Sequence, residues 1–172
     1  GLTDFVQGII MFVALILLPV VAFTELDGQF ASSLTTANPR AFDLIGDLTL
    51  IGIVSSLAWG LGYFGQPHII VRFMAVRSVR DVPAMRNIGM GWMGVALIGA
   101  LATGLTGAAY AARSGTAIAD PETIFILLSE LLFDPLVTGF LLAALLAAIM
   151  STISSQLLVS SSSLTEDFYR IF

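Results

Sequence analysis

Residues 5–23 form a hydrophobic stretch without a single charged side chain. A helix of this length rises about 28 Å, which is close to the thickness of about 30 Å of the hydrocarbon core of a bilayer. Three further apolar stretches follow, and charged residues make up only 11% of the chain, against about 25% in a typical soluble domain. The sequence therefore predicts an all-α integral membrane protein.

We expect four membrane spans, which we place at about 5–23, 48–75, 88–112 and 136–164. They are separated by polar segments at 24–47, 76–87 and 113–135, and followed by a tail at 165–172. Four of the seven arginines lie in or beside the middle segment: Arg72, Arg77, Arg80 and Arg86. By the positive-inside rule this loop is cytoplasmic, so the two acidic loops are external and the tail is cytoplasmic. We predict a multi-pass protein of the plasma (inner) membrane, in contact with the lipid bilayer.

The amino-acid content excludes several classes of function. There is no cysteine and no lysine, so thiolate chemistry is excluded and no basic nucleic-acid surface is expected. No Ser–His pair has a helical spacing that would bring it together, and metal-ligand clusters are absent, so we predict that the chain is not an enzyme. It starts almost inside one hydrophobic stretch and stops just after another, so we expect a piece of a longer protein.

The second span, 48–75, is not a uniform helix. Its middle reads Gly60-Leu-Gly-Tyr-Phe-Gly-Gln-Pro67, and three glycines with a proline weaken an α-helix strongly. The apolar stretches on either side are each too short to cross alone, so we expect one span broken at mid-membrane. Non-helical backbone at that depth is tolerated only inside protein or beside a cavity, and broken helices are a recurring device of secondary transporters. A glycine-rich kink made only for packing is the alternative.

Polar and aromatic side chains accompany this break. Trp59 and Tyr63 are four residues apart and would share one helix face, where two rings can hold a small apolar ring and attract an ammonium group. Gln66, Pro67 and His68 complete the set. We predict a solute site here. His68, the only histidine, is expected to form structural hydrogen bonds rather than to relay protons.

The fourth span carries a hydroxyl-rich segment, Ala148-Ile-Met-Ser151-Thr152-Ile-Ser-Ser-Gln156. A hard cation such as Na⁺ prefers several oxygen ligands, and Ser151 and Thr152 can supply two of them. Serine and threonine in membrane helices also commonly bond to backbone carbonyls of their own helix. The spacing alone does not decide between a Na⁺ site and hydrogen bonds within the helix.

The string Trp59-Gly-Leu-Gly-Tyr-Phe-Gly-Gln-Pro-His68 closely resembles the proline symporters of the solute:sodium symporter family. The strings Ala147-Ala-Ile-Met-Ser-Thr-Ile-Ser-Ser-Gln-Leu-Leu-Val159 and Ser163-Leu-Thr-Glu-Asp-Phe-Tyr169 resemble a later segment of the same family, as does the opening Thr3-Asp-Phe-Val-Gln7. The likeness covers essentially the whole chain, in order.

This resemblance implies a LeuT-type inverted-repeat transporter core, of which the chain is the middle, and Na⁺-coupled uptake of proline. It implies that Trp59, Tyr63 and Pro67 line the proline pocket, to which we add Gln66. It also implies that Na⁺ is bound by Ser151, Thr152 and the carbonyl of Ala148, and that the segment from Thr123 to Phe133 is an outer gate loop with a short amphipathic helix. The family's first broken helix is absent, so we do not expect the chain alone to transport. A symporter of the same fold for another small solute, and a non-transporting membrane sensor or scaffold, are the alternatives.

Overall fold

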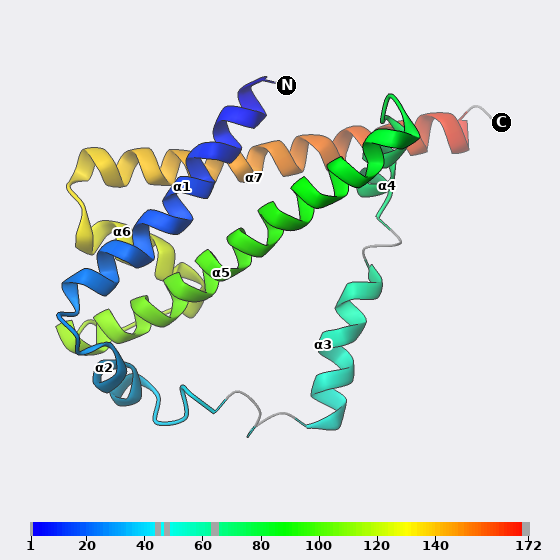
Figure 1. Ribbon diagram of the computed structural model, residues 1–172. Helices are drawn as coiled ribbons and strands as arrows, with labels where there is room; N and C mark the ends of the chain where they lie inside the picture. Colours follow the sequence, from blue (N-terminus) through cyan, green and yellow to red (C-terminus); the bar gives the residue numbers. More distant parts are fainter. Residues whose placement is uncertain (1, 44–45, 47–48, 63–65, 170–172) are drawn as a thin grey trace. The chain divides into compact units, whose positions relative to one another are not determined.

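The computed structural model describes residues 2–43, 46, 49–62 and 66–169, and this part of the chain is helical with short connections and contains no strand. The all-α prediction is confirmed for these residues. The chain forms two units, residues 1–43 with 91–148 and residues 44–90 with 149–172. Two long helices, α5 (Val82–Ser114) and α7 (Pro135–Ser163), contribute to both units (Figure 1).

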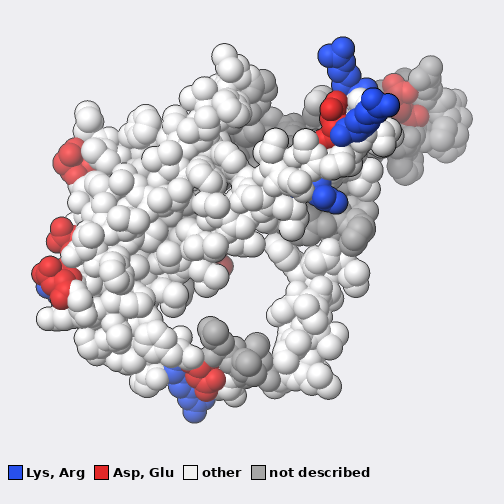
Figure 2. All heavy atoms as spheres, in the orientation of Figure 1, with Lys and Arg blue, Asp and Glu red and all other residues white. Residues whose placement is uncertain are grey.

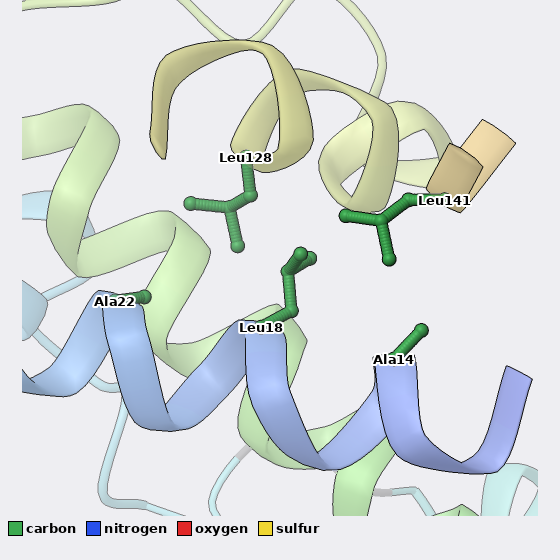
Figure 3. Close-up of a cluster of buried hydrophobic side chains, with 5 residues drawn as sticks. All are labelled: Ala14, Leu18, Ala22, Leu128 and Leu141. Carbon is green, nitrogen blue, oxygen red and sulfur yellow. The ribbon is translucent and has the colours of Figure 1, made fainter. Parts of the chain in front are cut away.

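The first unit is built around α1 (Leu2–Glu25), which packs against α6 (Ile124–Leu132). One face of α1 supplies Ala14, Leu18 and Ala22 at four-residue intervals, and these meet Leu128 of α6 and Leu141 of α7 (Figure 3). All five side chains are at most 4% exposed. A second cluster forms where α1 ends, around Leu26, Leu34 of α2 (Phe30–Ala37) and Ala109 of α5.

A different face of α1 packs against α5, and the two helices run in the same direction. Phe12 of α1 stacks on Trp92 of α5 with ring centroids 4.4 Å apart. Further along, Gly99 lies against Leu15, so closely that a Cβ on Gly99 would be 2.8 Å from the Leu15 carbonyl oxygen. The contacts therefore follow the same order along both helices, as expected for parallel helices. Small residues that let backbones approach are the usual means of helix association in membranes.

The C-terminal ends of α1 and α5 meet at Arg113. Its guanidinium donates a hydrogen bond to the carbonyl of Glu25, the last residue of α1, and lies 3.7 Å from a carboxylate oxygen of Asp27. The last carbonyls of a helix have no partner within the helix, so this contact satisfies one of them. Asp27 and Gly28 follow with φ values of 46° and 77°, and this left-handed backbone turns the chain away from α1.

The joint between α6 and α7 is also fixed by specific hydrogen bonds. Asp134 caps α7, since its carboxylate accepts from the backbone N–H groups of Leu136 and Val137. The buried hydroxyl of Thr138 donates to the carbonyl of Ser129 at 2.7 Å. Within the segment 113–135 the structure contains a short helix, α6, which is preceded by a 3₁₀ turn at Pro121–Thr123.

The second unit contains two short helices, α3 (Leu50–Gly62) and α4 (Pro67–Met74), a 3₁₀ turn at Val79–Asp81 and a π-helical turn at Leu164–Tyr169. The helix in the second predicted span is therefore not continuous: it ends at Gly62 and starts again at Pro67. Residues 63–65 lie outside the described part.

Among the described residues, three helical segments are long and apolar enough to cross a membrane: Phe5–Glu25, Val79–Ser114 and Pro135–Glu166. They coincide with the first, third and fourth predicted spans. The helix of the third begins at Val82, six residues before its apolar part, and helical structure after the fourth continues to Tyr169. Helices extend into water without needing apolar residues, so hydropathy marks the membrane part and not the helix ends.

Because the α1–α5 contact is closest at Gly99, we predict that Gly99→Ala lowers the free energy of unfolding by about 1–3 kcal/mol through overpacking. The matched control is Gly104→Ala on the same helix, where an added Cβ meets nothing within 4 Å. This control should be neutral or stabilising, because alanine favours helix over glycine by about 1 kcal/mol. Unfolding of the full-length parent in detergent measures both, and equal effects would contradict the assigned close approach.

Candidate functional site

Three of the four predicted solute-binding residues, Trp59, Gln66 and Pro67, lie on the two sides of the interruption between α3 and α4. Trp59 lies in the last turn of α3 and is 70% exposed in this chain. Gln66 directly precedes α4, and Pro67 is the first residue of that helix. Tyr63 lies outside the described residues, as do the two residues after it. The structure therefore describes the residues on either side of the interruption, and the pocket itself stays a prediction.

The start of α4 has the features of an anion-binding helix end. Gln66 has an extended backbone (φ −92°, ψ 104°), and its side chain does not cap the helix. Its carbonyl accepts from the N–H groups of Ile69 and Ile70, at 3.1 and 3.3 Å. Proline is well suited to the first helical position, where an N–H would have no partner within the helix. The positive end of the helix dipole favours a carboxylate here.

The predicted Na⁺ ligands lie together on α7, which is continuous through them. Ala148 lies one turn before Ser151 and Thr152. Ser151 and Ser155 are half-buried, whereas Thr152 is exposed, and the Ser155 hydroxyl donates to the Thr152 carbonyl at 2.8 Å. The structure thus brings the three predicted ligands onto one helical turn.

The first unit contains an apolar groove of about 360 Å³ between α1 and α5. Its lining is Leu15, Ile16, Pro19, Val20, Phe23, Thr24, Val95, Ile98, Gly99, Ala102 and Thr106. The hydroxyls of Thr24 and Thr106 donate to carbonyls of their own helices, at 2.8 and 2.7 Å. The groove therefore presents almost no polar group to a zwitterionic solute, and we do not assign it to substrate.

The sequence did not identify this groove. The glycine content of 88–112 indicates close packing, but the partner of each glycine depends on contacts between residues far apart in the chain. Gly99 and Leu15, for example, are brought together only by the parallel packing of α1 and α5.

Comparison with known proteins defines the class to which these helices belong. The chain belongs to the sodium:solute symporter family, whose sequence profile matches residues 1–172. Together with the three membrane-length helices, this makes it part of a multi-pass protein of the plasma membrane. The resemblance found in the sequence is confirmed.

Named relatives cover the whole chain. It is 56% identical over 174 residues to the osmoregulated proline transporter OpuE of Bacillus subtilis, and 57% identical over 170 residues to the high-affinity proline transporter PutP of that species. It is 54% identical over 172 residues to a sodium/proline symporter of Staphylococcus aureus. These alignments include 98–100% of this chain but only 34–36% of each relative. The chain thus spans about a third of the length of these relatives. No solved structure matches it.

Proposed function

We propose that the parent protein performs Na⁺-coupled secondary active uptake of proline by alternating access, and that this chain supplies the middle of its transport core. The observation that carries the proposal is the identity of 54–57% along the whole chain with proteins named as proline transporters or sodium/proline symporters. The chain alone is not expected to transport, because it contains one of the two broken helices expected in a LeuT-type core.

The direction of α1 and α5 supports a membrane crossing at the interrupted helix. Both helices are long enough to span, and they run parallel with their C-terminal ends joined at Arg113. If both end on the same side of the membrane, the chain between Glu25 and Val82 must return once to the other side. Since α2 has only 8 residues, four of them serine or threonine, the longer apolar helix α3 together with α4 is better suited to this crossing.

Helix lengths support the same conclusion. The 13 residues of α3 rise about 20 Å and the 8 residues of α4 about 12 Å. Neither covers a hydrocarbon core of about 30 Å, but together they do. The interruption would then lie inside the membrane, where non-helical backbone requires a protein or aqueous cavity around it.

A zwitterion such as proline fits the groups at this interruption. Its carboxylate would lie at the start of α4, beside Gln66, where the dipole is positive. Its ammonium would lie against the aromatic faces of Trp59 and Tyr63, and its apolar ring would pack between them. Pro67 shapes the helix end that receives the carboxylate.

We assign Na⁺ to the turn of α7 formed by Ala148, Ser151 and Thr152. These supply one carbonyl and two hydroxyl oxygens, fewer than Na⁺ requires, so the remaining ligands would come from the rest of the transporter. For coupling, Na⁺ must bind the outward-open state more tightly than the inward-open state. In the LeuT-type arrangement, α6 would belong to the outer gate.

Two alternatives have distinct tests. A same-fold Na⁺ symporter for another small solute would leave the Na⁺ site intact and change the solute pocket. A non-transporting sensor or scaffold would bind without uptake, and a signalling module elsewhere in the parent would favour it.

The first test is uptake of labelled proline into vesicles that contain the full-length parent, with an inward Na⁺ gradient and then with K⁺ in its place. We expect uptake with Na⁺ only. Trp59→Leu should raise the KM for proline about tenfold, since a desolvated cation–π contact contributes about 1–2 kcal/mol, whereas Trp59→Phe, which keeps a ring, should have a smaller effect. Absence of proline uptake with either ion would contradict the proposal. If proline uptake were present but insensitive to both substitutions, the assigned pocket would be wrong.

The second test addresses the ion site. Ser151→Ala and Thr152→Ala should each weaken apparent Na⁺ affinity about tenfold or more, because interactions with a charged partner contribute about 1.5–3 kcal/mol. The control is Ser161→Ala on the same helix, whose hydroxyl donates to the Leu158 carbonyl at 3.0 Å. Na⁺ dependence of uptake and the amount of inserted protein are measured together. Loss of insertion in parallel with affinity, or an equal effect of Ser161→Ala, would refute the assignment.

A further inference from the structure

The segment between α4 and α5 exposes three arginines around a single turn. Val79–Asp81 form a 3₁₀ turn capped by Ser78, whose hydroxyl accepts from the Arg80 N–H at 3.3 Å. The Asp81 N–H donates to the Ser78 carbonyl at 2.9 Å. Arg77 therefore precedes the capping residue, Arg80 lies within the turn, and Arg86 lies about one helical turn into α5. Figure 2 shows blue arginine side chains gathered where α5 begins.

No described residue forms an ion pair with these side chains. Arg77, Arg80 and Arg86 are exposed. The Arg86 guanidinium donates to the neutral side-chain oxygen of Asn87, at 3.1 and 3.2 Å. Asp81 is the one acidic residue between Arg72 and Arg86. The turn therefore presents guanidinium groups suited to a phosphate, which arginine binds with paired N–H donors.

Apolar side chains are interleaved with these arginines. Val79, between Ser78 and Arg80, is 87% exposed, and Met74, at the end of α4, is 78% exposed. Exposed apolar groups beside cationic ones are typical of segments that lie in the membrane interface. Only residues 75–78 separate α4 from the membrane-length segment Val79–Ser114, and this short connection keeps the turn close to the membrane surface. A soluble nucleic acid or acidic protein would not account for the exposed valine.

We propose that Arg77, Arg80 and Arg86 form a binding site for the headgroup phosphate of an anionic phospholipid, with Val79 inserted beside its acyl chains. Each arginine near an anionic membrane surface contributes about fivefold in binding. The carboxylate of Asp81 opposes this attraction. The proposal does not depend on which solute the parent carries.

The test measures binding of phosphatidylglycerol to the purified full-length parent by native mass spectrometry over a range of lipid concentrations. Phosphatidylcholine serves as the neutral lipid. Arg80→Gln should weaken phosphatidylglycerol binding about fivefold, and the triple Arg77→Gln, Arg80→Gln, Arg86→Gln change about a hundredfold if the effects add. Arg40→Gln, an equal change of charge in the segment 24–47, should have no effect.

Asp81→Asn keeps every arginine and should tighten binding, a result that misfolding would not produce. Added salt should weaken binding to the unsubstituted protein. Equal binding of both lipids, unchanged binding by Arg80→Gln, or no tightening by Asp81→Asn would overturn the proposal. The readout is lipid retention and not transport. A negative lipid-binding result therefore does not contradict proline uptake, and a negative uptake result does not contradict lipid binding.

Discussion

The close approach of α1 and α5 is the contact on which the path of the chain depends. It is possible because Gly99 lacks a side chain where the Leu15 backbone passes, and it is reinforced by the stacking of Phe12 on Trp92. Arg113 then joins the ends of both helices through the carbonyl of Glu25. Parallel helices that span a membrane require a return crossing between them, so this packing determines what the intervening residues must do.

We place that return in the segment of α3 and α4, whose helix is interrupted before Pro67. Gly60, Gly62 and Gly65 weaken the helix around its end at Gly62. A new helix, α4, starts at Pro67. In hydrocarbon, backbone groups released by such an interruption need partners, and a transported ion or solute can be one of them. The same constraint thus links an unfavourable local sequence to a proposed binding function. The hydroxyls of Ser151 and Thr152 on α7 are neutral oxygen ligands, as backbone carbonyls are.

Much of this arrangement was predictable from the sequence because membrane helices follow hydropathy and length. The three long helices, the interruption before Pro67 and the short helix within 113–135 correspond to local patterns. The Arg113 contact with Glu25 was not predictable, since 88 residues separate the partners. The start of α5 at Val82 was missed because charges near Arg86 were read as loop, although a capped turn at Ser78 begins the helix earlier. The solute and Na⁺ residues stay predictions, since Tyr63 lies outside the described residues and we propose that further Na⁺ ligands come from the rest of the transporter.

The central claim is that residues 44–81 carry the chain across the membrane once. The chain has no cysteine, so Asn38→Cys and Ser78→Cys can be introduced singly into the full-length parent after removal of any cysteines elsewhere. A membrane-impermeant maleimide is then applied to intact cells and to permeabilised cells. We predict that Asn38→Cys is labelled in intact cells and Ser78→Cys only after permeabilisation. Labelling of both positions from the same side would contradict the crossing and, with it, the placement of the interrupted helix within the membrane.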